Sequence, residues 1–204
     1  MYSFNYLKPV SIEDAASMLS ESDEHMVISG GMTLIPTLKQ RLARVEHLIG
    51  LEKCGLNEIK LDGELLKIGA MATHAEVSES DIVVMVNPAI AELASHIGDR
   101  QVRNRGTIGG SLANNDPSAC YPAAILALGG IIHTTKRDIK AEEFFVDLFE
   151  TALEEDEIIT AVSLPKPDAA AYEKFPNPAS RYAMVGVFVA KFNSEIRVAV
   201  TGAG

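Results

Sequence analysis

The stretches SGGMT (residues 29–33) and TIGGS (residues 107–111) each carry a glycine pair beside small hydroxyl residues. The first stretch follows the apolar run at residues 26–28. In both, glycine allows a sharp turn and the close approach of a ligand to bare backbone amides. Two such turns in one chain could cradle the two phosphates of a single pyrophosphate, which favours a dinucleotide-type cofactor. The candidate binding residues within them are Ser29, Gly30, Gly31, Met32, Thr33, Thr107, Ile108, Gly109, Gly110 and Ser111.

The composition is that of a folded, acidic protein. The 204 residues are enough for one large domain or two small ones, and 47% hydrophobic with 23% charged residues is ordinary for a globular chain. The formal net charge of −10 argues against binding to nucleic acid. The nearest basic stretch, residues 100–105, is short and directly precedes the second glycine pair, where it suits a single anionic ligand or an acidic partner surface.

The cysteines and the N-terminus favour a cytoplasmic location. Cys54 and Cys120 form no CxxC motif, and no Cys/His cluster has the spacing of a zinc site. Both cysteines are therefore expected to be free thiols in a reducing compartment, and no metal site is expected. Residues 1–6 lack the basic start and apolar core of a signal peptide, and no stretch approaches membrane-spanning length.

The first 51 residues predict a helix followed by a small βαβ unit. Ser11 and residues 12–19 have the hydroxyl N-cap, acidic first turn and apolar spacing of a helix. The expected elements after it are a strand at 26–28, a helix carrying Leu34, Leu38 and Leu42, and a strand at 47–51. His25 and His47 flank these strands and are expected to be ordinary strand-end histidines.

The remaining sequence predicts a larger mixed lobe. Asp62-Gly63 between two apolar runs is typical of a hairpin, and residues 168–171 read as a linker. We therefore expect an α+β fold with an N-terminal lobe at 1–55, a second lobe at 56–170 and the start of a truncated C-terminal domain at 171–204. The other expected elements are helices starting at 73, at 89–97 and at 122–128, and strands at 129–134, 158–164, 182–192 and 196–201.

The glycine pairs predict an anion site. A strand that enters a glycine pair and then a helix brings free amides and the positive helix end to one point, and the first pair has this context. The second pair is followed by Asn115 and Asp116, which can bond phosphate or ribityl oxygens. For either pair alone, a plain tight turn is the competing interpretation. His74 and His96 have no accompanying nucleophile, so no catalytic side chain is expected.

Two longer motifs carry a family resemblance. Residues 29–36 with 41–44, and residues 97–106 with 107–111 and Asp116-Pro117, resemble the two flavin motifs of the FAD-binding (medium) subunits of molybdenum hydroxylases, the carbon monoxide dehydrogenase and xanthine dehydrogenase type. The resemblance spans essentially the whole chain, and the second motif is the more specific. It implies that FAD is the cofactor, with its pyrophosphate at the glycine loops. It also implies the two-subdomain FAD-binding fold shared with vanillyl-alcohol oxidase.

The same resemblance implies further flavin contacts. It places an apolar contact at Ile97, a strand lining the isoalloxazine at Ile159, a lysine near the flavin at Lys174 and an aromatic side chain on the ring at Tyr182. Relatives usually carry an acid at the position of Cys120. Since a thiol is a poor acceptor, binding of the ribityl chain would lean on Asn115 and Asp116.

Relatives also usually place an acid just before the aromatic residue, where this chain has Arg181.

The resemblance implies an electron-transfer subunit of an oxidoreductase complex. Its partners would be an iron–sulfur small subunit and a large subunit that holds the molybdenum cofactor, in a hetero-oligomer. The flavin would pass electrons from the iron–sulfur clusters to an external acceptor, with no catalytic residue in this chain. Two alternatives remain: a truncated flavin-binding or assembly module without turnover, and a stand-alone flavin oxidoreductase.

Overall fold

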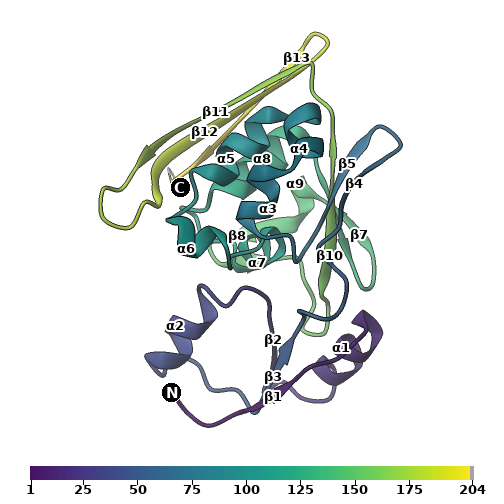
Figure 1. The fold of residues 1–204 in the computed structure, drawn as a ribbon, viewed down its shortest axis with the longest axis vertical. Coiled ribbons are helices and arrows are strands. Elements are labelled where there is room, and N and C mark those ends of the chain that lie inside the picture. Colours follow the sequence, from purple (N-terminus) through teal and green to yellow (C-terminus); the bar gives the residue numbers. More distant parts are fainter. Residues whose placement is uncertain (203–204) are drawn as a thin grey trace.

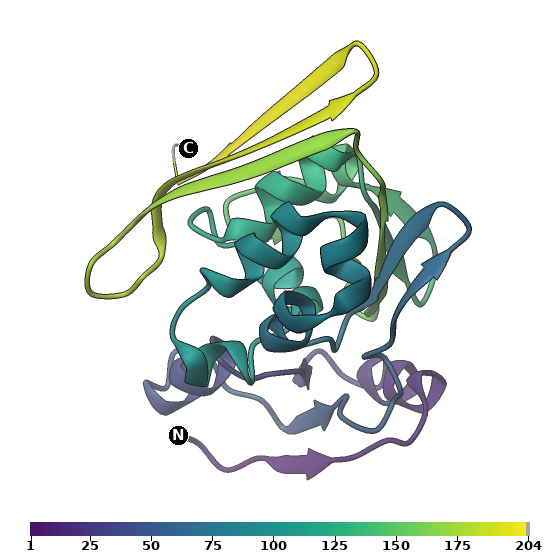
Figure 2. The same cartoon turned by 45° about the horizontal axis from the view of Figure 1, so that its top comes forward.

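A small N-terminal lobe, a larger lobe of helices and sheet, and a long three-stranded sheet follow one another along the chain (Figure 1). The computed structural model describes residues 1–202. The N-terminal lobe lies at one end, the helices occupy the middle, and the last three strands cross the far side of those helices. Figure 2 shows the same succession after a 45° turn.

The N-terminal lobe is a parallel sheet with strand order β1-β3-β2. Its first helix begins as predicted, because the Ser11 hydroxyl accepts the backbone N–H of Asp14 at 3.1 Å. Since β2 and β3 pair in parallel across α2, the predicted βαβ unit is confirmed. The elements are β1 (Asn5–Leu7), α1 (Ile12–Leu19), β2 (His25–Ile28), α2 (Leu34–Lys39) and β3 (His47–Gly50).

One prediction in this lobe is wrong. Leu42 was expected to continue the helical spacing of Leu34 and Leu38, but α2 ends at Lys39. Arg41 has a left-handed φ of 60°, which stops the helix, and Leu42 is 74% exposed.

The second lobe packs helices against a five-stranded sheet of order β4-β5-β10-β6-β7. The predicted hairpin is confirmed: β4 and β5 are antiparallel, and Gly63 at their turn has φ +62°. The sheet strands are β4 (Ile59–Asp62), β5 (Leu65–Gly69), β6 (Ile131–Thr134), β7 (Asp138–Lys140) and β10 (Ile159–Pro165), beside the small pair β8 (Phe145–Asp147) and β9 (Glu150–Thr151).

The helices of this lobe are short and mostly capped by hydroxyl or acidic side chains. Thr73 and Glu76 form a capping box at the start of α3, and Asp99 caps α6. The helices are α3 (His74–Glu79), α4 (Asp81–Val86), α5 (Pro88–Ser95), α6 (Arg100–Arg103), α7 (Ile108–Asn114), α8 (Cys120–Leu128) and α9 (Ala141–Phe144). Within residues 1–202, no helix has both the length and the apolar character needed to cross a membrane.

The last sheet comprises the antiparallel strands β11 (Ala169–Pro176), β12 (Ala183–Phe192) and β13 (Glu195–Thr201). The predicted linker at 168–171 is therefore wrong, because Ala169 already pairs with Lys191. One face of this sheet packs on α5 and α8, and Phe188 joins the same hydrophobic core as the helices. The other face exposes a row of apolar side chains, namely Ile196, Val198 and Val200.

This shared core predicts that the last sheet unfolds together with the second lobe. Phe188 is fully buried, so Phe188→Ala should lower the free energy of unfolding by about 3–5 kcal/mol in a single transition. Ile196→Ala, on the exposed face of the same sheet and 63% exposed, should change it by no more than about 0.5 kcal/mol. Denaturant unfolding followed by circular dichroism measures both; two separate transitions would contradict a shared core.

Candidate functional site

A cavity of about 690 Å³ is lined by residues of the N-terminal lobe, the second lobe and the last sheet. Its volume lies within the usual range for small-molecule and cofactor sites. Both glycine stretches contribute to its wall. Fifteen of the seventeen predicted site residues line it, namely Ser29, Gly30, Gly31, Met32, Thr33, Ile97, Thr107, Gly109, Gly110, Ser111, Asp116, Cys120, Ile159, Lys174 and Tyr182.

The first glycine loop presents bare amides, as the sequence predicted. It leaves β2 after Ile28, turns at Gly31 with φ +73°, and enters α2 at Leu34. Within residues 1–202, the consecutive backbone N–H groups of residues 30–33 donate to no protein acceptor. A run of successive free amides is a site for an anion such as a phosphate.

The second glycine pair differs from the predicted turn. It forms the first turn of α7, and its amides are engaged within the protein. The N–H of Ile108 donates to the carbonyl of Ala72 at 3.1 Å, and that of Gly109 donates to the carbonyl of Ala70 at 2.9 Å. The N–H of Gly110 donates to the hydroxyl of its own N-cap, Thr107, at 3.1 Å. The expectation of bare amides is thus met by the first loop alone.

One glycine of each pair, Gly30 and Gly110, allows the two loops to come into contact. A Cβ on Gly30 would collide with the carbonyl oxygen of Arg105, and a Cβ on Gly110 would lie 2.7 Å from the Ser29 hydroxyl oxygen. The Thr107 hydroxyl donates to that same Ser29 oxygen at 3.0 Å. Glycine is therefore required at position 30, and glycine at position 110 leaves room for the Ser29 hydroxyl, so that the two lobes come into contact along one wall of the cavity.

Two predicted residues do not line the cavity. The Ile108 side chain is fully buried in the main hydrophobic core. Asn115 caps the end of α7 in a left-handed conformation, and its amide nitrogen donates to the carbonyls of Asp147 and Glu150 at 2.8 and 2.9 Å. Asn115 thus ties α7 to the small β8–β9 pair.

At another part of the wall, Lys174 reaches from β11 to α8. Its ammonium group donates to the carbonyl of His96 at 2.9 Å and lies 3.4 Å from the Cys120 sulfur. Lys174 thereby links the last sheet to two segments of the helical lobe. Ile97, from the segment after α5, and Tyr182, directly before β12, line the same cavity.

His74 and Glu157 line the cavity although the sequence did not mark them as site residues. Burial, followed by the positive charge of Arg103, lowers the pKa of His74 to about 4. Burial alone would raise the pKa of Glu157, but hydrogen bonds from Arg137 and Thr134 outweigh it and the pKa falls below its usual value. The sequence predicted a helix starting at residue 73 but gave no sign that His74 lines a cavity.

A hydrogen-bonded group of three polar side chains lies outside the cavity. Asp138 and Ser163 contact the two ring nitrogens of His133 at 2.6 and 2.7 Å. These residue types occur in hydrolytic triads, but Ser163 is only 4% exposed and does not line the cavity. These hydrogen bonds link β7, β6 and β10.

A family described as the FAD binding domain in molybdopterin dehydrogenase matches residues 2–167. The chain belongs to this family. The sequence resemblance to FAD-binding subunits of molybdenum hydroxylases is thereby confirmed, as are the flavoprotein oxidoreductase class and FAD as the cofactor of the family.

Curated relatives and solved structures agree with this family. The chain is 36% identical over 97% of its length to the nicotine 6-hydroxylase medium subunit of Paenarthrobacter nicotinovorans, covering 74% of that protein. It is 36% identical over 92% of its length to the carbon monoxide dehydrogenase medium chain of Afipia carboxidovorans, covering 68% of it. A carbon monoxide dehydrogenase structure from Hydrogenophaga pseudoflava superposes with a TM-score of 0.93 at 34% identity, over 98% of this chain and 75% of the other. The α+β fold of this FAD-binding domain is therefore confirmed.

The buried His74 predicts a pH-dependent stability of this FAD-binding domain. Between pH 6.5 and pH 4 the unfolded chain binds a proton at this position that the folded chain does not bind. The free energy of unfolding should therefore decrease as the pH falls through this range, by up to about 3 kcal/mol from His74 alone. His74→Gln should remove that part of the pH dependence, as measured by denaturant unfolding at pH 7.5, 6 and 5.

A control for this prediction is His96→Gln, which replaces an exposed histidine and should leave the pH dependence nearly unchanged. A His74 imidazole that titrates near pH 6.5 in the NMR spectrum of the folded protein would contradict the prediction.

Proposed function

We propose that FAD binds in the cavity, with its pyrophosphate at the free amides of residues 30–33, and that this chain transfers electrons within a molybdenum hydroxylase complex. The observation that carries the proposal is the run of successive bare amides on the cavity wall of a protein from an FAD-binding family. A cavity of about 690 Å³ with such a run fits a dinucleotide that carries two phosphates.

The other predicted flavin contacts are proposed because their residues line the same cavity. Thr107, Ser111 and Asp116 offer polar side chains that line the same cavity, and Gly109 and Gly110 place no side chain on its wall. The apolar side chains of Ile97 and Ile159 and the ring of Tyr182 offer surfaces for the isoalloxazine. Because Lys174 already holds the Cys120 sulfur, that thiol is a secondary contact.

Bound FAD supplies the redox chemistry, since a flavin can accept electrons and pass them on. The chain's own residues bind and orient it. The contact between Ser29 and Thr107 holds the two loops together, and the apolar side chains of Ile97 and Ile159 on the cavity wall would shield a bound ring from water. Because the pKa of His74 is lowered, its ring is neutral near pH 7 and adds no positive charge to the cavity wall.

The assembly that we propose is based on the subunit names of the relatives. Several of these are named as the medium subunit or medium chain of a dehydrogenase or hydroxylase, which implies larger and smaller partner subunits. We propose an iron–sulfur small subunit and a molybdenum-cofactor large subunit as the partners, in a cytoplasmic hetero-oligomer. The lobes at 1–55 and 56–170 would hold the flavin, together with Lys174 and Tyr182 on the side of the last sheet.

The proposal predicts that the chain binds one equivalent of FAD and that Gly110→Val weakens this binding. The valine would displace Ser29 from the loop contact, so we expect an affinity lower by about 10-fold or more. Quenching of FAD fluorescence on titration with protein measures the affinity. Circular dichroism should show that the variant remains folded.

Gly110→Ala is the matched control. Its Cβ meets only the end of the Ser29 side chain and the Thr107 hydroxyl, which can move, so its affinity should lie between those of the wild type and the valine variant. Unchanged affinity in a folded Gly110→Val variant would remove the loop contact from the site. If the wild-type chain retains no FAD once the excess is removed, the proposal itself is contradicted.

Electron transfer separates the favoured function from the alternatives. In the reconstituted complex, substrate should reduce the flavin through the iron–sulfur subunit, and the bleaching of flavin absorbance reports this step. A stand-alone flavin oxidoreductase would be reduced by a soluble donor without any partner. An assembly module would bind the partner but show no flavin reduction.

A further inference from the structure

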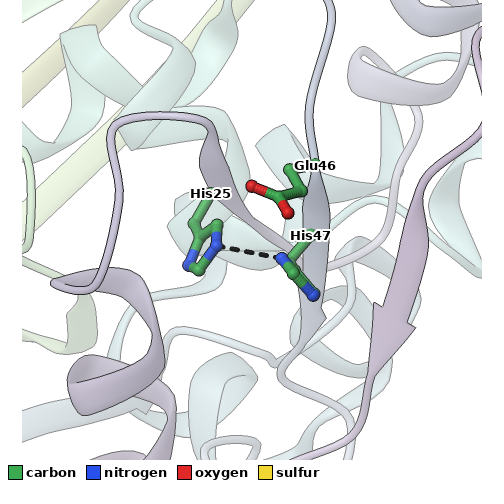
Figure 3. A group of neighbouring side chains, drawn as sticks. All are labelled: His25, Glu46 and His47. Atoms are coloured by element: carbon green, nitrogen blue, oxygen red, sulfur yellow. Dashed lines mark hydrogen bonds between the residues drawn. The ribbon is translucent and has the colours of Figure 1, made fainter.

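Two histidines and a glutamate gather where β2 and β3 begin (Figure 3). His25 and His47 are paired in the parallel register of these strands, and Glu46 precedes His47. Each residue offers one ligand atom, and the three atoms lie within 4.8 Å of one another. We propose that His25, Glu46 and His47 bind a divalent transition-metal ion of the zinc type.

The protonation of His25 suits a metal ligand. Its Nδ1 lies 2.6 Å from the carbonyl oxygen of Met18, at the end of α1. A carbonyl only accepts, so Nδ1 carries the proton and Nε2 carries the lone pair. A ring that donates its other N–H to a backbone carbonyl is the usual orientation of a metal-binding histidine. The Nε2 lone pair faces His47 (Figure 3).

His47 completes the pair of nitrogens. Its Nδ1 lies 2.9 Å from Nε2 of His25, and its Nε2 lies 3.3 Å from the Asn5 side-chain amide. The Asn5 amide nitrogen faces Nε2 of His47 and donates to it, so without a metal the proton on Nδ1 of His47 is donated to Nε2 of His25. A divalent ion would take the place of this proton between the two rings. His47 would then carry its proton on Nε2, toward the Asn5 oxygen after rotation of the amide.

The distances and ligand types fit zinc after a small adjustment. Zinc–nitrogen bonds of about 2.0–2.1 Å in a tetrahedral site place the two nitrogens about 3.3 Å apart. The rings would therefore separate by about 0.4 Å from their present 2.9 Å. The Glu46 carboxylate adds an oxygen ligand and a negative charge, and because its side chain is exposed, water can take the fourth position.

The backbone holds the ligands in place. The N–H of Glu46 donates to the carbonyl of Glu24 at 2.8 Å, and its carbonyl accepts the N–H of Asn5 at 2.9 Å. The ligand-bearing segment is thus fixed on both sides. An ion here would join α1, β2 and β3, whose own hydrophobic clusters are small. Such lobes gain most from a bound metal.

The proposed metal site lies at the start of the strand that leads into the first glycine loop. β2 starts at His25 and leads, after Ile28, directly into the free amides of residues 30–33. A metal at the start of this strand would therefore stabilise the lobe that carries the phosphate-binding loop, without contacting the cofactor itself.

Zinc binding to the tag-free protein tests the proposal. We expect one equivalent of Zn²⁺ per chain, and Tm should rise by about 5 °C or more at 100 times the dissociation constant. Co²⁺ should give the visible absorption of a tetrahedral site. His25→Ala should abolish this absorption, and Glu46→Gln, at an exposed position where folding is least affected, should weaken binding by about 10-fold.

His96→Ala is the control, because it removes an exposed histidine outside the cluster and should leave zinc binding unchanged. Two outcomes would overturn the proposal. One is the absence of stoichiometric binding, which means that the two rings share a proton in place of an ion. The other is equal binding by the wild type and a folded His25→Ala variant. FAD titration of the same samples reports separately on the cofactor site.

Discussion

The close approach of two backbone segments sets the geometry of the whole site. Gly30 lies so near the carbonyl of Arg105 that no side chain fits between them. The hydroxyls of Thr107 and Ser29, 78 positions apart in the sequence, then bond across the contact. Because this contact presses the small N-terminal lobe against the helical lobe, the cavity acquires walls from both. A side chain at position 30 would separate the first loop from the rest of the site.

The two glycine pairs are similar in sequence but have different structural roles. The first has four consecutive amides without a protein acceptor, in residues that line the cavity, whereas the amides of Ile108, Gly109 and Gly110 donate within the protein. Glycine at the second pair removes side chains so that α7 can pack against Ala70 and the first loop. The first pair thus offers free amides and, at Gly30, also takes part in the lobe contact, whereas the second pair serves packing. The flavin site that we propose would depend on both.

Local signals in the sequence predicted much of this structure, and long-range pairing explains the rest. The Ser11 cap and the Asp62-Gly63 hairpin depend on neighbouring residues, so both were predictable. The strand at 169–176 exists because it pairs with β12 and packs on the helices, which its alanine-rich start does not reveal. Likewise, the meeting of His25 with His47 depends on the register of two strands and not on sequence spacing.

The most direct test of the central claim is a ¹⁵N NMR titration of the chain with FAD. If the first loop holds the pyrophosphate, the largest amide shifts should fall on Gly30, Gly31, Met32 and Thr33, because their N–H groups gain an acceptor. The amides of Ile108 and Gly109 already donate to backbone carbonyls and should shift much less. The largest shifts at residues 108–110, with little change at 30–33, would contradict the account.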